Sequence, residues 1–283
     1  MMKKLKIAFI GGMTDGKIVY EYLSKNKHVD LSLTITYPDN TEVPRHVNFP
    51  ESKNIIKTNS ANQYVDKFND LDYIFVCGWS ELLSNEILKS AKKGVIGFHP
   101  SKLPRDRGRS VVAWQIEDGY TEISLTMFYY IDFPDGGDII AQENIKIEYN
   151  DYLNDVLDKI DQATYNLIYA NFQLIRKGII KPRKQILSEG NFRRLRTSRD
   201  SKINWNTNSL NIYNKIRAIS HPYPCAIGEI ENINYKIVKA KVLKKFEFGN
   251  ECNPGVLVSK LFDNSLVVKT KDNFILIQEY EKL

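Results

Sequence analysis

Short apolar runs alternate with amphipathic segments over the first hundred residues, and this alternation limits the possible folds more than any other feature. The continuous apolar run at 7–10 and the segment DYIFVC at 72–77, which is apolar after its aspartate, predict strands buried on both faces. Residues 15–25 carry apolar side chains at helical spacing. Alternating strands and helices predict an α/β fold with a doubly wound, Rossmann-like parallel sheet. The predicted strands are 7–10, 31–35, 72–77, 94–98, 124–131 and 138–147, and the predicted helices are 15–25, 85–92 and 151–177.

The composition of the chain changes near Pro182, which predicts a second domain. Residues 183–202 are polar and contain five arginines, as expected of a linker or a covering arm. A helix at 210–219 and five short alternating segments between 226 and 280 then predict a small β-rich, OB-like domain. We therefore expect a catalytic domain at 1–182, a linker at 183–202 and a C-terminal domain at 203–283.

Bulk properties restrict the partners. No apolar stretch approaches the roughly 20 residues of a membrane helix, so we expect no membrane partner. The three cysteines show neither metal spacing nor even pairing, which favours a reducing cytoplasmic setting and no metal site. The net charge of +6 suits an anionic partner, although lysine is abundant throughout the chain.

Two segments carry candidate chemistry. The sequence GFHPSKLP at 97–104 follows the predicted strand 94–98 and places His99 where a doubly wound sheet binds its ligands. The sequence DGGD at 135–138 places Asp135 in a second turn. A histidine beside a carboxylate is the minimum apparatus for moving a proton at neutral pH. The structural alternatives are a histidine hydrogen-bonded at a strand end and an aspartate that accepts from backbone N–H groups in its turn.

These segments resemble the active-site segments of folate-dependent formyltransferases. That family carries a strand ending in Asn-x-His, a Ser-Leu-Leu-Pro loop, an Arg-Gly pair and an Asp-x-Gly turn. Here His99, the sequence SKLP at 101–104, the RG pair at 107–108 and Asp135 match these elements. The sequences FRR at 192–194, INW at 203–205 and IRA at 216–218 resemble the family's linker and the entry to its C-terminal domain, so the resemblance covers nearly the whole chain.

The resemblance implies a role for each matching residue. His99 and Asp135 would be catalytic, with Asp135 orienting His99 and raising its pKa through a charge-assisted hydrogen bond. The formyl donor would be 10-formyl-tetrahydrofolate, and no metal would be needed. The resemblance assigns Trp79, Leu83 and Asp138 to the folate, and Ser101, Arg107 and Arg109 to the acceptor substrate. The two arginines belong to the stretch 105–109, which we expect to form a flexible cationic lip.

Gly97 departs from the family pattern. The family has an asparagine two residues before the histidine, which donates a hydrogen bond to the formyl oxygen as charge develops there. Losing one such donor typically costs roughly 10²–10³ in rate. Three interpretations stay open: another donor replaces it (a backbone N–H, a water, or a side chain from 79–81), the chain relies more on His99, or the chain is impaired.

The resemblance favours a sugar N-formyltransferase, related to methionyl-tRNA formyltransferase. The acceptor would be the amine of a dTDP- or UDP-linked sugar of the 4-amino-4,6-dideoxyhexose type, as in O-antigen biosynthesis, and the enzyme would be a homodimer. The sequence RGR at 107–109 resembles sugar enzymes, because tRNA enzymes usually have small residues after the glycine. We therefore expect no nucleic-acid partner. The alternatives are a methionyl-tRNA formyltransferase and a non-catalytic folate or nucleotide binder.

Overall fold

The computed structural model describes residues 4–283, whose contacts divide the chain into two compact units. The first unit comprises the described residues up to Gly108 together with Ile123–Ile145 and Asp158–Phe192, and the second comprises Arg109–Glu122, Lys146–Leu157 and Arg193–Leu283. This division differs from the expected boundaries. Residues 183–192 belong to the first unit, and two short segments of the expected catalytic domain, Arg109–Glu122 and Lys146–Leu157, belong to the second.

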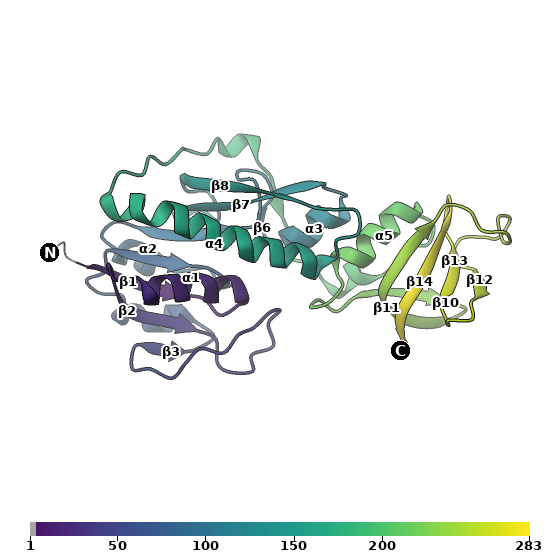
Figure 1. Cartoon of the computed structure of the whole chain (residues 1–283), viewed down its shortest axis with the longest axis horizontal. Coiled ribbons are helices and arrows are strands. Elements are labelled where there is room, and N and C mark those ends of the chain that lie inside the picture. Colours follow the sequence, from purple (N-terminus) through teal and green to yellow (C-terminus); the bar gives the residue numbers. More distant parts are fainter. Residues whose placement is uncertain (1–3) are drawn as a thin grey trace. The chain divides into compact units, whose positions relative to one another are not determined.

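A seven-stranded sheet forms the centre of the first unit, in the order β3-β2-β1-β4-β5-β7-β8 (Figure 1). Pairing is parallel from β3 to β5, which confirms the α/β fold class. However, β7 runs antiparallel to β5, so the sheet is mixed. The strands are β1 (Leu5–Ile10), β2 (Val29–Thr36), β3 (Ile55–Lys57), β4 (Tyr73–Val76), β5 (Val95–His99), β7 (Glu122–Tyr129) and β8 (Ile139–Lys146).

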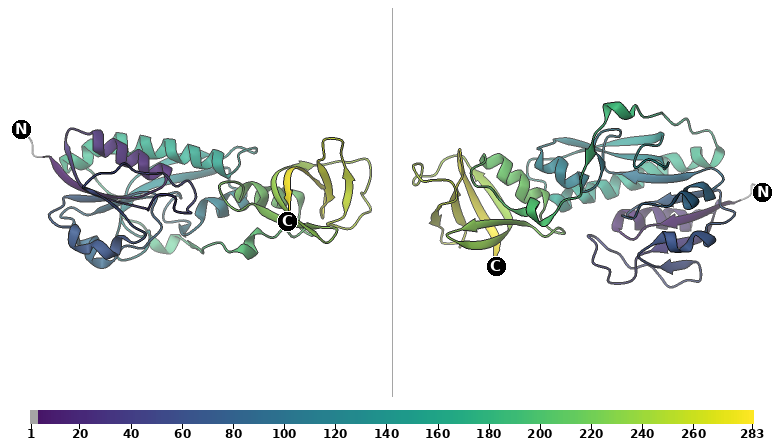
Figure 2. Two further views of the ribbon diagram at one scale, coloured as in Figure 1. Left: turned by 90° about the horizontal axis from the view of Figure 1, so that it is seen from below. Right: turned by 180° about the vertical axis from the view of Figure 1, so that it is seen from behind.

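Helices cover both faces of this sheet, because its central strands are apolar on both sides. The ring centroid of Phe9 lies 6.0 Å from that of Tyr20 in α1 (Thr14–Lys25). The ring centroid of Phe75 lies 6.4 Å from that of Phe172 in α4 (Leu153–Lys177). Alternate residues of β1 and β4 pack on the other face against the 3-10 helix η1 (Ala61–Lys67) and α2 (Asn85–Ser90). Figure 2 shows α1 and α4 together on one side of the sheet.

An ion-pair cluster joins the start of α1 to α4. Asp161 accepts from the Arg45 guanidinium at 2.6 Å and from the Thr14 hydroxyl at 3.2 Å. Burial raises the pKa of Asp161 from 3.8 to about 6 despite the charge of Arg45. The folded state therefore binds this proton more tightly than the unfolded chain does. The stabilisation is full below pH 3.8 and is lost as the pH rises through about 6.

We expect Asp161→Asn to remove this pH dependence. A shift of about 2 pKa units corresponds to about 3 kcal/mol. Between pH 4 and 7, the free energy of unfolding of the wild type should fall by up to this amount relative to the variant. Urea denaturation of both proteins across this range measures the difference. A constant difference would contradict the assignment.

The second unit contains a five-stranded sheet in the order β10-β11-β14-β13-β12. Its four strand pairs are all antiparallel, as expected of a β-rich C-terminal domain. Helix α3 (Val111–Glu117) packs against α5 (Ser209–Ala218) in the same unit. The strands are β10 (Ala226–Ile230), β11 (Ile233–Leu243), β12 (Leu257–Lys260), β13 (Leu266–Lys269) and β14 (Phe274–Lys282).

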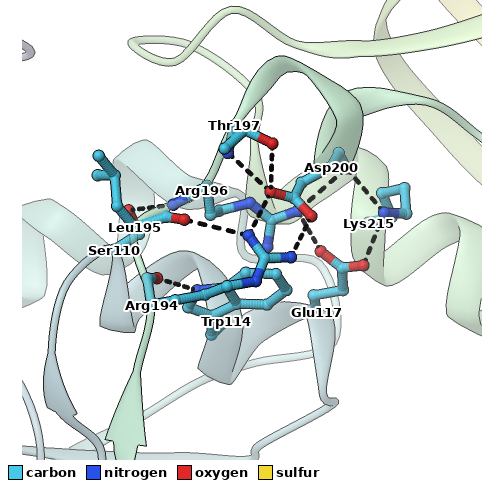
Figure 3. A network of polar contacts seen from close by, with 9 residues as sticks. All are labelled: Ser110, Trp114, Glu117, Arg194, Leu195, Arg196, Thr197, Asp200 and Lys215. Carbon is cyan, nitrogen blue, oxygen red and sulfur yellow. Dashed lines mark hydrogen bonds and ion pairs between the residues drawn. The ribbon is translucent and has the colours of Figure 1, made fainter.

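Two of the five arginines expected in the linker stabilise this second unit. The guanidinium groups of Arg194 and Arg196 lie 4.8 Å and 4.0 Å from the Trp114 ring (Figure 3). Arg194 pairs with Asp200 at 2.6 Å, and Arg196 pairs with Glu117. These arginines hold α3 by stacking and charge, so they are part of a packed structure.

Residues 4–283 contain no helix that combines the length and apolar character needed to cross a membrane.

Candidate active site

His99 ends strand β5 in the first unit, where its side chain is almost buried, with 6% of the residue exposed. Its Nε2 lies 2.9 Å from the backbone carbonyl of Asp106. A carbonyl oxygen can only accept, so Nε2 carries the proton in this contact and donates it. The neutral ring therefore keeps Nδ1 as its basic nitrogen, able to accept a proton.

Asp135 faces that basic nitrogen. Its Oδ1 lies 3.6 Å from His99 Nδ1, and its Oδ2 accepts from the backbone N–H of Gly108 at 2.8 Å. The 3.6 Å between Asp135 Oδ1 and His99 Nδ1 suits an ion pair but is too long for a hydrogen bond. The expected charge-assisted hydrogen bond is therefore not formed in this structure, and the carboxylate is held by its backbone donor. Catalytic hydrogen bonds are often long without substrate, so this distance is compatible with a pair that exchanges protons.

The backbone around this pair is strained. Asp106 and Asp135 both have positive φ angles, 52° and 54°, which residues other than glycine rarely adopt. Such strain persists only where the surroundings fix it, and it concentrates at functional sites.

Two side chains from 185–191 fix the strained segments, and sequence reasoning missed both. Asn191 accepts from the Asp106 N–H at 2.9 Å and donates to its carboxylate at 3.0 Å. Gln185 donates to the carbonyls of Asp135 and Gly137 at 2.9 and 2.6 Å. The composition of this segment predicts a linker, and nothing in its local pattern indicates such long-range contacts.

The expected acceptor-binding residues do not form one exposed lip. Ser101 is fully buried, and its hydroxyl donates to the Arg105 carbonyl at 2.8 Å. Arg107 is 3% exposed, and its guanidinium stacks 4.3 Å from the Phe192 ring. Its Nη2 donates to the Leu187 carbonyl at 3.1 Å. Ser101 and Arg107 thus hold the loop together in this structure, whereas Arg109 is exposed.

The residues expected to bind folate lie in two segments of the first unit. Trp79 is half-buried and stacks on Tyr37 with ring centroids 4.2 Å apart. Leu83 packs against the core under η1 and α2. Asp138 lies in the turn that carries Asp135, and its carbonyl accepts from the Tyr129 N–H at 2.9 Å. Their contacts with folate stay predictions.

The described residues include no group of three or more His, Cys, Asp or Glu side chains placed to hold a metal ion.

Comparison with known proteins assigns both parts of the chain. Residues 5–171 match the family "Formyl transferase", and residues 196–282 match "Formyl transferase, C-terminal domain". A methionyl-tRNA formyltransferase of Mycoplasma mycoides is 30% identical, over 100% of this chain and 92% of that protein. One of Clostridium acetobutylicum is 28% identical, over 98% of this chain and 92% of that protein.

Solved structures share the fold. WlaRD, a sugar 3N-formyltransferase crystallised with dTDP and 5-N-formyl-THF, has a TM-score of 0.71 at 22% identity and covers 99% of this chain and 98% of its own. The N-formyltransferase of Helicobacter canadensis, in complex with folinic acid and dTDP-3-aminofucose, also has a TM-score of 0.71 at 22% identity. The match covers 98% of this chain and 100% of that chain. Since the family models match most of the chain and the site contains a paired histidine and aspartate, this protein belongs to the formyl transferase family.

Proposed function

We propose that this enzyme transfers a formyl group from 10-formyl-tetrahydrofolate to the amine of a nucleotide-linked amino sugar. The observation that carries formyl transfer is the basic Nδ1 of His99, which faces Asp135 at 3.6 Å while Nε2 is fixed by Asp106. An acceptor amine must lose a proton as it attacks, and an imidazole so held is a suitable base.

The bound donor supplies a formyl carbon as electrophile and a folate nitrogen as leaving group. His99 takes the proton of the acceptor amine at Nδ1, and the imidazolium then forms an ion pair with Asp135. The same nitrogen returns the proton to the leaving folate nitrogen. Asp135 keeps its orientation throughout because its second oxygen stays bound to the Gly108 N–H.

The side chains near the site suit a flat, largely apolar group such as the folate ring. Leu82, three residues after Trp79 in the chain, is 73% exposed, and Ile131 is 48% exposed in the segment that leads to Asp135. Asn85 donates to Asp132 at 3.0 Å, which ties these two segments together. Exposed apolar side chains on linked segments are typical of ligand sites.

Three observations support an amino sugar as the acceptor. Solved structures that match nearly the full length of this chain include enzymes crystallised with dTDP or dTDP-3-aminofucose. The sequence RGR at 107–109 also resembles sugar enzymes. The net charge of +6 suits the diphosphate of such an acceptor.

Initiator methionyl-tRNA is the second candidate, favoured by one specific observation. The curated relatives that match the whole chain at 28–30% identity are methionyl-tRNA formyltransferases. This alternative predicts tRNA binding that weakens steeply as salt increases, because phosphate contacts release counterions.

A formyl-transfer assay with each acceptor in turn distinguishes these two candidates. The enzyme is incubated with 10-formyl-tetrahydrofolate and either methionyl-tRNA or a panel of dTDP- and UDP-linked 3- and 4-amino sugars. We expect an amino sugar to gain the mass of one formyl group and methionyl-tRNA to stay unformylated, with no tRNA gel shift at low salt. Formylation of methionyl-tRNA alone would contradict the amino-sugar acceptor and favour the second candidate. Binding of folate without any formyl transfer would favour a non-catalytic binder.

The proposal includes a cytoplasmic homodimer. Cys77, Cys225 and Cys252 are free thiols, as expected in a reducing compartment. Light scattering of the purified protein tests the dimer, and fractionation of cells that express it tests the compartment.

A further inference from the structure

The ring of Tyr130 occupies the space beside Gly97. A Cβ atom built on Gly97 would lie 1.9 Å from Cε1 and 2.6 Å from Cζ of Tyr130, far inside van der Waals contact. The backbone N–H of Tyr130 donates to the Val95 carbonyl at 2.8 Å, and its ring packs 5.1 Å from the Phe128 ring. The ring is thus held over bare backbone, and Gly97 is the residue that leaves room for it.

This position places the Tyr130 phenol next to the catalytic pair. Gly97 and His99 are two residues apart in β5, so their side-chain positions lie on the same face of the sheet. The carbon that bears the phenolic oxygen, Cζ, is the atom 2.6 Å from the virtual Cβ. The phenol therefore lies where a side chain at position 97 would project, beside His99.

The side-chain donors expected in 79–81 are already engaged. The Ser80 hydroxyl shares a 2.9 Å hydrogen bond with Tyr37, and the Trp79 N–H points to Glu81 at 3.4 Å. By contrast, no hydrogen bond of the Tyr130 hydroxyl is found among residues 4–283. A free hydroxyl in a half-buried position keeps its donor capacity for a ligand.

We propose that the phenol of Tyr130 replaces the missing asparagine and donates a hydrogen bond to the formyl oxygen during transfer. This inference rests on the proposed formyl transfer and adds a catalytic residue to it. When the amine attacks, a C–N bond forms and the carbonyl π electrons move onto oxygen, where Tyr130 stabilises the charge. As the C=O bond reforms and the folate C–N bond breaks, the charge leaves the oxygen, and Tyr130 keeps its own proton throughout.

The surroundings keep that proton in place. Burial raises the pKa of Tyr130, and the negative charges of Asp135, Cys77 and Asp15 raise it further when those groups are ionised. The phenol is therefore neutral at physiological pH and able to donate. Preorganised donors of this kind are most effective where water is excluded.

Tyr130→Phe tests the proposal, because it removes the oxygen and keeps the ring over Gly97. We expect kcat to fall roughly 10²–10³-fold, with the KM for the acceptor changed less than about threefold. Tyr129→Phe is the matched control, since that phenol belongs to the adjacent residue, whose side chain points to the other face of β7, and its loss should change kcat less than about threefold. Equal activity of the two variants, or a Tyr130→Phe enzyme that retains a third of the wild-type kcat, would overturn the assignment.

A rescue variant provides a second test of the proposal. In Tyr130→Ala the ring is gone, and adding Gly97→Asn places the family's donor in the vacated space. We expect the double variant to exceed Tyr130→Ala at least tenfold in kcat. Gly97→Asn by itself should be nearly inactive, because its side chain collides with the Tyr130 ring. A single Gly97→Asn variant faster than the wild type would contradict this account.

The assay also distinguishes this inference from the choice of acceptor. Hydroxylamine is used as a generic nucleophile alongside the amino sugars, because the phenol acts on the formyl oxygen whichever nucleophile attacks. Loss of hydroxylamine-dependent donor turnover in Tyr130→Phe supports the tyrosine even if every sugar fails. A wild type that consumes the donor with neither nucleophile would overturn both proposals.

Discussion

Replacing His99 by glutamine should lower kcat by roughly 10²–10⁴-fold while the fold is preserved. The amide of glutamine can still donate to the Asp106 carbonyl, as Nε2 does at 2.9 Å in the wild type. It cannot accept a proton, so the acceptor amine must attack without a base and the ion pair with Asp135 cannot form. Steady-state kinetics over pH, together with thermal unfolding, measure both expectations.

Comparison of kcat with stability distinguishes a base from a merely structural histidine. If Nδ1 is the base, the glutamine variant should lose kcat while its thermal unfolding stays close to that of the wild type. His28→Gln is the control, because His28 lies outside the site and its exchange should leave both kcat and thermal unfolding unchanged. A glutamine variant that keeps the wild-type kcat would make His99 structural.

The central strands were predictable because their signal is local. Runs such as IAFI and YIFV are apolar on both faces, and a strand of this kind is stable only inside a covered parallel sheet. The direction of β7 was not predictable in this way. Its alternating pattern fits either direction, and the choice is made by pairing with β5.

Helix α3 shows where local preference fails. Its sequence begins with two valines, which favour strands, and Ser110 before it has a positive φ and forms no side-chain cap. The helix is stabilised by packing against α5 and by the stacking of two arginines on Trp114. Each of these partners lies about 80 residues or more further along the chain, beyond the reach of any local pattern.

The site divides in the same way. His99 and Asp135 could be identified because rigid, glycine- and proline-rich turns surround them. Gln185, Asn191 and Tyr130 could not, because their roles depend on atoms brought together by tertiary folding. Gly97 marks a missing donor in the sequence, and the proposal that Tyr130 replaces it depends on the position of the ring beside Gly97.

Gly137→Ala should lower kcat/KM at least 100-fold, because the turn that holds Asp135 cannot accept a side chain there. A Cβ on Gly137 would lie 1.7 Å from the carbonyl oxygen of Tyr129, which is backbone and cannot rotate away. Relief requires the turn to move, and a displacement near 1 Å at a catalytic group costs roughly 100-fold. Overpacking should also lower the free energy of unfolding by about 1–3 kcal/mol.

Gly136→Ala is the matched control for this effect. Its Cβ would meet a ring carbon of Phe133 at 2.4 Å, but that side chain is 38% exposed and can swing outward. We therefore expect less than a tenfold loss of kcat/KM for Gly136→Ala. Because the two glycines are adjacent, any general intolerance of alanine in this turn would affect both variants alike. Equal losses would show that the position of Asp135 relative to His99 does not depend on the close approach of Gly137 to Tyr129.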